Sequence, residues 1–382
     1  MNPAATLVAI RLAFWLGTAL TLVWAPAPGR RLIGDAYGPA SDLFFRTFSQ
    51  WDARWFLQIA DHGYEEVPQA AAFFPVYPAL AHALAWVTGS TLVAGVVISL
   101  VAAGVAAWAL AELARPVLGN RGAHDAVLYL ALYPVAFVFT SLYSDGLFLA
   151  LAATSFLAAS RGRSVTAGVL GGLATGTRLL GLALLPALVL LLWRGRDPRA
   201  LARLAPLLLL PAAVGLYALY LDHVLGDPWA FTSAQADWSR DTPLLGPLEG
   251  LKDAIQAAGH GARDLLDLPA AGPGHDEQVA LWNVSHLVLL GVAAWLTWVA
   301  WRRLGSAFGL YSAATLAIVL AVPAEGFPLV SLPRFLLADF PLFLALASLT
   351  LERPRARDAT LVTFAAVGAV CAAAFARGIW IA

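Results

Sequence analysis

The sequence predicts an all-α integral membrane protein with about eleven transmembrane helices. Apolar residues make up 60% of the 382 residues and charged residues only 13%, and the mean hydropathy is +0.73. A soluble domain has roughly 45–50% apolar and about 25% charged residues. Long apolar runs also alternate with short arginine-rich segments. We expect one multi-pass membrane domain over residues 1–382.

The first apolar run, within residues 1–29, is near 20 residues long and can cross a bilayer. It lacks the short core behind a basic start of a cleavable signal, so we expect an uncleaved helix with Arg11 near its cytoplasmic end. Ten further runs are predicted to span, at about 91–113, 124–141, 143–160, 164–177, 179–193, 204–224, 281–301, 306–322, 333–350 and 359–380.

The run at 73–88 is short and contains Pro75, Pro78 and His82, which favours an interfacial helix. Five arginine clusters then all fall on the cytoplasmic side, as the positive-inside rule requires. They are Arg115 with Arg121, Arg161 with Arg163, the run Arg194, Arg196, Arg199 and Arg203, Arg302 with Arg303, and Arg353, Arg355 and Arg357. Two polar segments, about 27–90 and 225–280, come to the outer face.

The composition also bears on the classes of function. The net charge is zero, so no nucleic-acid footprint is visible. Cys371 is the single cysteine, which leaves no disulfide framework and no cysteine-based metal site. No HExxH, P-loop or GxGxxG motif occurs, so metal-hydrolase and nucleotide-binding functions lack support. We expect no metal and no cofactor. The glycines of "GVLGGLATG" (Gly168, Gly172 and Gly176) have the spacing of close helix packing.

The stretch "SQWDARWFLQIADHGY" places ionisable groups among aromatic residues. If Ser41–Asp61 is one helix, Asp52 projects between Phe48 and Trp55, in the middle of an apolar stripe. A carboxylate there is costly unless it is paired or used in function. If the helix instead begins after Trp51, Asp52 would cap its N-terminus. The two interpretations are compatible.

Three further charged residues lie at predicted outer helix ends. Asp145, in "LYSDGLFL", begins a helix, where capping alone would explain an acid. Arg178 lies at an outer turn between two spans, and Arg334 begins a late span. Such arginines can bind a phosphate bidentately, or they can snorkel to lipid head groups. For His62, the simplest interpretation is that it packs within a polar loop.

These segments resemble a known family. "SQWDARWFLQIADHGY" with "AAAFFPVYPAL" resembles the signature of the PIG-V-like mannosyltransferases, the family of GPI mannosyltransferase 2. "LYPVAFVFTSLYSDGLFLAL", "GLATGTRLLG", "GDPWAFTSAQADW" and "LPRFLLADFPLFLALA" resemble later blocks of the family, in order. The sequence departs from the family's pattern at two positions. Asp145 occupies a position where glutamate is usual, and Leu179 occupies one where proline often follows the arginine.

The resemblance implies a GT-C fold and a glycosyltransferase with an essential acid in its first outer loop, a position that Asp52 occupies. It implies a polyprenyl- or dolichyl-phosphate-linked mannose as donor, and the acceptor, a lipid or a glycan, is left open. We expect Asp52 to be the catalytic base. The predicted substrate-binding residues are Arg178 and Arg334 for phosphate, Trp51, Trp55 and Tyr64 for sugar, and Asp61, His62, Asp145 and Gln235. A transporter or flippase of lipid-linked sugars, or a GT-C transferase for a pentose, is the alternative.

Overall fold

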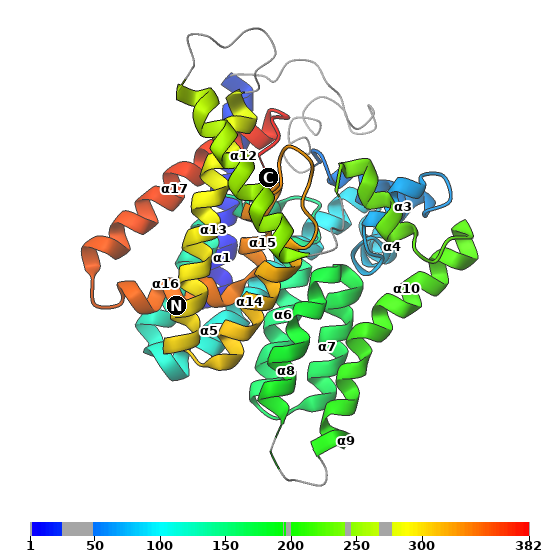
Figure 1. The fold of residues 1–382 in the computed structure, drawn as a ribbon, viewed down its shortest axis with the longest axis horizontal. Helices are drawn as coiled ribbons and strands as arrows, with labels where there is room; N and C mark the ends of the chain where they lie inside the picture. Colours follow the sequence, from blue (N-terminus) through cyan, green and yellow to red (C-terminus); the bar gives the residue numbers. More distant parts are fainter. Residues whose placement is uncertain are drawn as a thin grey trace.

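The protein is described by a computed structural model that covers residues 2–24, 49–193, 195, 200–240, 246–266 and 277–381. Helices run through these ranges, which contain no strand (Figure 1). The prediction of an all-α fold is confirmed. The start of the predicted helix at Ser41, and Arg194, Arg196 and Arg199, lie outside the described residues.

The N-terminal half begins with α1, and the first outer segment then folds as two short helices, α3 and α4, before a long bent helix, α5. The bounds are α1 Pro3–Trp24, α3 Ala53–His62, η1 Pro68–Ala72, α4 Val76–Thr88, α5 Thr91–Leu132, η2 Ala136–Thr140, α6 Asp145–Ser160, α7 Ser164–Thr177, η3 Leu179–Ala183 and α8 Leu184–Leu192. The 13-residue α4 is about 20 Å long, too short to span. This length agrees with the interfacial helix predicted at 73–88.

The second half contains α9 to α17 and carries the second polar segment on α11, η5 and α12. The bounds are α9 Ala200–Leu204, η4 Ala205–Leu208, α10 Leu209–Leu225, α11 Ala230–Ser233, η5 Ala234–Trp238, α12 Pro247–Leu266, α13 Glu277–Arg303, α14 Ser306–Leu320, α15 Leu332–Ala338, α16 Phe340–Thr350 and α17 Pro354–Ala376. The axes of α15 and α16 meet at a 78° bend.

The chain is a multi-pass membrane protein, but the predicted count of eleven spans is not confirmed. Within the described residues, five helices are long and apolar enough to cross a membrane, or six if the bent pair α15–α16 is one span. Three predicted spans form shorter apolar segments, Asp145–Ser160, Leu179–Leu192 and Ser306–Leu320. Two others, 91–113 and 124–141, are largely joined in α5, whose backbone breaks at Gly119, three residues after Pro116.

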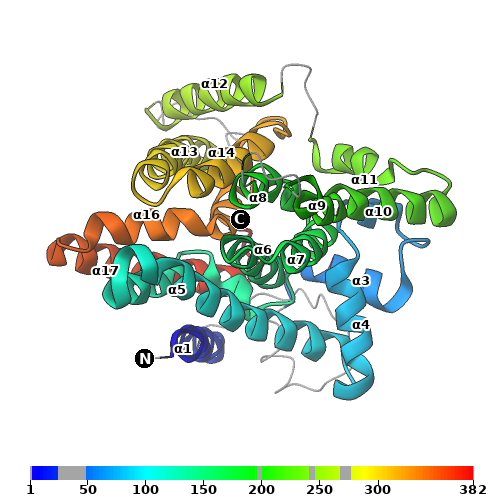
Figure 2. The ribbon, with the colours of Figure 1, turned by 90° about the horizontal axis from the view of Figure 1, so that it is seen from below.

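The centre of the bundle is α6, which packs against α5, α7 and α8, and α10 in turn packs against α7 (Figure 2). The predicted glycine packing is found on α7. A Cβ at Gly168 would lie 2.2 Å from the carbonyl oxygen of Pro206, and one at Gly172 would lie 3.0 Å from that of Leu209. The glycines therefore let α10 and the turn before it approach the backbone of α7.

The described arginine clusters lie at the helix ends remote from Asp145 and Arg334. Arg161 follows the end of α6, where it pairs with Glu112 at 2.6 Å. Arg303 donates to the carbonyl of Ser348 near the end of α16. The bundle thus has an arginine-rich end and an opposite end, where the candidate site forms.

Candidate active site

Four charged side chains predicted from the sequence meet at one place, although they come from four separate segments. Arg334 donates from Nη1 to Oδ2 of Asp52 at 2.6 Å and from Nη2 to Oδ2 of Asp145 at 3.0 Å. Arg178 donates from Nη1 to Oδ1 of Asp145 at 2.5 Å. The residues from the first outer segment, α6, the end of α7 and α15 therefore form one ion-paired cluster, which we call the charged site.

Burial differs strongly across the charged site. The side chains of Asp145 and Arg334 are 1% and 7% exposed, whereas those of Arg178 and Asp52 are 16% and 22% exposed. The buried pair thus forms the floor of the site, and Asp52 and Arg178 face its opening. Asp145 serves as the counter-ion that lets two guanidinium groups stay buried near each other, since unpaired buried charges are very costly.

Asp145 does not cap its helix. The N-cap residue of α6 is Ser144, and Asp145 occupies the first helical position with both carboxylate oxygens bound to arginines. The capping interpretation therefore does not explain this acid. The next residue, Gly146, allows α6 to approach α5, because a Cβ there would lie 2.7 Å from the carbonyl oxygen of Ser99.

Asp52 lies at the N-cap position of α3, but its side chain makes no capping hydrogen bond. The prediction of one continuous helix to Asp61 is wrong at this point, because Trp51 has a φ of 55° and the helix begins at Ala53. The periodicity of apolar residues could not reveal the positive φ of Trp51. Asp52 is therefore directed at Arg334 from a helix end instead of the middle of an apolar stripe.

Tyr143 holds the segment that carries Asp52. Its hydroxyl donates to the carbonyl of Gln50 at 3.1 Å and accepts from the backbone N–H of Asp52 at 3.3 Å. Its ring lies 4.7 Å below the guanidinium carbon of Arg334. The backbone of Tyr143 is fixed in turn by Ser99, whose hydroxyl donates to its carbonyl at 2.9 Å.

The "FFPVYP" segment supports this arrangement from α4. The hydroxyl of Tyr77 donates to the carbonyl of Gly95 at 2.9 Å and lies 2.9 Å from the hydroxyl of Ser99. Tyr77 and Ser99 are both fully buried. The chain of contacts from Tyr77 through Ser99 to Tyr143 therefore gives the motif a positioning role for the charged site.

Arg240 is a member of this region that the sequence did not single out. It stacks 6.0 Å from the ring of Phe335, and Arg178 lies 5.5 Å from the same ring. Burial lowers the pKa of Arg240 to about 10; the charge of Asp52 opposes this shift, while Arg334 and Arg178 add to it. Arg240 thus stays protonated at neutral pH. Its only sequence signal is its place just after "AQADWS".

Backbone strain concentrates at the same site. Within the described residues, three non-glycine residues have positive φ, namely Trp51 at 55°, Ser239 at 53° and Ser331 at 63°. They precede Asp52, Arg240 and α15, respectively. Such conformations cost on the order of 1–3 kcal/mol each and cluster at functional sites. The segments that carry Asp52, Arg240 and Arg334 therefore each enter the site through a turn that the surrounding structure must enforce.

The remaining predicted residues are distributed around the site. Trp55 stacks on Phe73 and meets Trp238 edge-on at 5.6 Å, so it forms an aromatic wall with the second polar segment. Trp51 is 39% exposed. Tyr64 is buried, and its hydroxyl donates to the carbonyl of Phe73 at 2.8 Å.

Three other predicted residues are not joined to the charged cluster by any hydrogen bond or ion pair within the described residues. Asp61 accepts from the hydroxyl of Thr91 at 2.6 Å, and His62 is the exposed last residue of α3. Gln235 lies on η5, where its carbonyl accepts from the N–H of Arg240 at 3.1 Å. No group of three metal-ligating side chains occurs among the described residues.

Apolar grooves run along the bundle, and none of the three described below is lined by a residue of the charged site. One, of about 920 Å³, lies between α4, α7 and α10 and includes Gly176, two residues before Arg178. A second, of about 690 Å³, lies between α13 and α17 and includes Pro333, which precedes Arg334. Each groove therefore includes a residue that is close in sequence to one arginine of the site.

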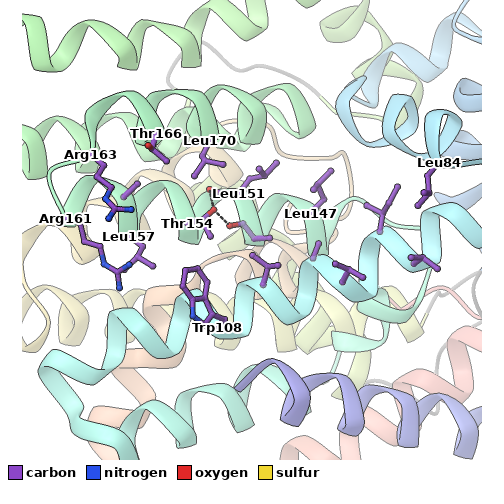
Figure 3. Close-up of a pocket in the computed structure, with 17 residues that line it drawn as sticks. Leu84, Trp108, Leu147, Leu151, Thr154, Leu157, Arg161, Arg163, Thr166 and Leu170 are labelled. Atoms are coloured by element: carbon purple, nitrogen blue, oxygen red, sulfur yellow. Dashed lines mark hydrogen bonds between the residues drawn. The ribbon is translucent and has the colours of Figure 1, made fainter. Parts of the chain in front are cut away.

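A third groove, of about 650 Å³, follows α6 between α5 and α7 (Figure 3). Its polar end is formed by Arg161 and Arg163, at the arginine-rich end of the bundle. The groove is also lined by Leu147, two positions after Asp145 on α6. Side chains two positions apart on a helix project in nearly opposite directions, about 200° around the helix axis. Asp145 therefore faces away from this groove, which does not open on the charged site.

Comparison with known proteins identifies similar sequences. Residues 38–196 match the family described as Mannosyltransferase (PIG-V). A 150-residue segment is 34% identical to GPI alpha-1,6-mannosyltransferase 2 of Cricetulus griseus; it makes up 35% of this chain and 29% of that protein. The matched segment thus spans less than a third of that relative's length.

The whole fold also has a counterpart. A structure of ArnT from Cupriavidus metallidurans, bound to undecaprenyl phosphate, superposes with a TM-score of 0.52 over 96% of this chain and 63% of the ArnT chain. Sequence identity is 17%, so this likeness concerns the fold. Residues 38–196 are thus similar to the PIG-V mannosyltransferases, and the fold of the chain is similar to that of ArnT.

Proposed function

We propose that the protein transfers a hexose, mannose by its family resemblance, from a polyprenyl phosphate to an acceptor hydroxyl. The observation that carries the proposal is the convergence of Asp52, Asp145, Arg178 and Arg334. It is joined by an apolar groove whose lining includes Gly176, two positions before Arg178. A lipid phosphate sugar has one apolar part and one anionic part. An apolar groove next to buried guanidinium groups complements both.

Asp52 is the proposed general base. Only its Oδ2 is bound by Arg334; Oδ1 has no hydrogen-bond partner within the described residues, and the side chain is 22% exposed. The acceptor oxygen attacks the anomeric carbon from the face opposite the phosphate, so the configuration inverts. Its proton passes to Asp52, a step that typically contributes about 10²–10⁴-fold.

The leaving phosphate needs positive charge as the glycosidic bond breaks. Fixed guanidinium groups stabilise developing charge without reorganising, and arginine remains protonated at any working pH. Arg178, partly exposed at the opening, is the proposed phosphate ligand beside the groove of α4, α7 and α10. Arg334 is bound to both acids and so also orients Asp52.

The reaction is proposed to occur on the extracytoplasmic face. The described arginine clusters lie at the opposite end of the bundle, and such clusters face the cytoplasm in membrane proteins. The site would then be separated from cytoplasmic nucleotide sugars. A flippase would carry its polar residues near mid-depth, whereas here they gather at helix ends.

The test is a transfer assay with full-length protein in nanodiscs and radiolabelled mannosyl polyprenyl phosphate. We expect release of polyprenyl phosphate by the wild type and its loss in Asp52→Asn, while Asp237→Asn, an exposed acid of the second polar segment, stays active. EDTA should not reduce turnover. Activity with GDP-mannose alone, or more than about a tenth of normal turnover in Asp52→Asn, would contradict the proposal.

A further inference from the structure

The charged site and the neighbouring Arg240 together contain more positive than negative charge. Asp52 and Asp145 contribute two negative charges, and Arg178, Arg334 and Arg240 contribute three positive charges, which sum to +1. The extra cation is Arg240, since the other four residues are ion-paired with one another.

Arg240 also differs from Arg178 and Arg334 in its partners, because its printed hydrogen bonds go to neutral carbonyls and not to a carboxylate. Its Nη1 and Nη2 each donate to a backbone carbonyl, those of Val322 and Val330, at the long distances of 3.2 and 3.4 Å. A guanidinium has five N–H donors, so three have no hydrogen-bond partner within the described residues. Arg334, by contrast, binds a carboxylate through each terminal nitrogen.

The backbone around Arg240 is built to hold this position. Arg240 pairs with Ala324 in an isolated bridge, and the N–H of Glu325 donates to the carbonyl of Ser239 at 2.8 Å. Ser239 has a φ of 53°, a strained conformation for a residue other than glycine. The second polar segment is thereby tied to the loop that leads into α15, and Arg240 reaches the site from it.

We infer that Arg240 binds the phosphate of the lipid donor and of the lipid phosphate product as the third cation of the charged site. This inference rests on the proposed function, and it adds to Arg178 a second arginine that has donors available for the phosphate. The donor is a phosphodiester of charge −1, which matches the net charge of +1.

The charges of the site and of the bound lipid also match after transfer. When the bond from the anomeric carbon to the phosphate oxygen breaks, its electron pair stays on that oxygen. The product is then a phosphomonoester, which carries about −1.5 to −2 at pH 7. A new bond joins the anomeric carbon to the acceptor oxygen, and the acceptor proton moves to Asp52. The charge of the site rises from +1 to +2, close to the charge of the product. Without Arg240 the site would be neutral before transfer.

The test measures lipid binding directly, by tryptophan fluorescence of full-length protein in detergent. The probes are undecaprenyl phosphate and its methyl ester, which carries a single charge. Hydrogen bonds to charged groups predict that Arg240→Gln weakens undecaprenyl phosphate binding about ten- to a hundredfold. The loss for the methyl ester should be several-fold smaller, because less charge faces the missing cation.

Two variants separate binding from folding. Arg240→Lys keeps the charge and should bind undecaprenyl phosphate more tightly than Arg240→Gln. Arg263→Gln removes an exposed arginine of the same polar segment and should bind as the wild type does. In turnover assays, Arg240→Gln should raise KM for the donor more than it lowers kcat.

The outcomes distinguish the two proposals. If the wild type binds neither lipid, the proposed function fails. If the wild type binds and Arg240→Gln binds within about twofold of it, the role of Arg240 is wrong. The charge-dependent contact between Arg240 and the phosphate would also be refuted by either of two results. One is that Arg240→Gln loses the same affinity for both lipids; the other is that Arg240→Lys binds undecaprenyl phosphate no more tightly than Arg240→Gln.

Discussion

Asp145 should be the residue on which the stability of the charged site depends most. Its side chain is 1% exposed and binds Arg178 at 2.5 Å and Arg334 at 3.0 Å. Asp145→Asn keeps the shape but leaves two guanidinium groups without this counter-ion. Breaking a buried ion pair in this way costs about 3–5 kcal/mol, which lowers the ratio of folded to unfolded protein by about two to three and a half orders of magnitude.

Asp52→Asn is the matched comparison. Asp52 makes one ion pair and is 22% exposed, so solvent screening reduces the expected cost to about 1 kcal/mol or less. Unfolding of the purified variants in detergent, by heat or denaturant, measures the difference. The double variant Asp145→Asn with Arg178→Gln should recover about 0.5–3 kcal/mol, because the charges are coupled. If Asp145→Asn were as stable as Asp52→Asn, the assignment of Asp145 as the buried counter-ion would be refuted.

Three further predictions follow from other parts of the structure. Tyr143→Phe removes the hydroxyl that fixes the backbone at Asp52, so kcat should fall about tenfold, the effect of one net hydrogen bond, with a nearly unchanged KM; an unchanged kcat would contradict that role. Gly168→Val places side-chain atoms against a backbone carbonyl 2.2 Å from the built Cβ, and should lower the melting temperature of the protein by several degrees; a wild-type melting curve would show that α7 does not need the close approach. In cells, a cysteine at Arg263 should react with an impermeant thiol reagent, and one at Arg303 should not; labelling of the latter would reverse the proposed orientation.

The helical fold could be predicted from the sequence because apolar run length and arginine placement are local signals. The number of spans could not be predicted in the same way. The backbone changes direction at Gly119 within α5 and at the 78° bend between α15 and α16. Hydropathy measures only how apolar a segment is, so it does not reveal such changes. That residues 73–88 do not form a full span was predictable, because Pro75, Pro78 and His82, which are unfavourable in a span, lie close together there.

The charged site shows a different limit. Asp52 was identifiable because an acid among aromatic residues is costly and demands an explanation. Its partner Arg334 lies 282 positions away, and no periodicity connects them. Arg240 could not be identified in this way, because an arginine in a polar segment is expected to be exposed to solvent. Only the fold shows that the turn at Ser239 delivers it beside Phe335.

The order of the site residues along the chain has a consequence for biosynthesis. Asp145 and Arg178 lie 33 positions apart and face each other across the hairpin of α6 and α7. Charges are costly in a bilayer unless paired, and these two can neutralise each other as soon as this hairpin has been synthesised. Arg334, 189 positions after Asp145, emerges much later and then binds both acids. In a nascent chain that has not yet delivered α15, Asp52 therefore lacks its guanidinium partner, so the charged site is complete only near the end of synthesis.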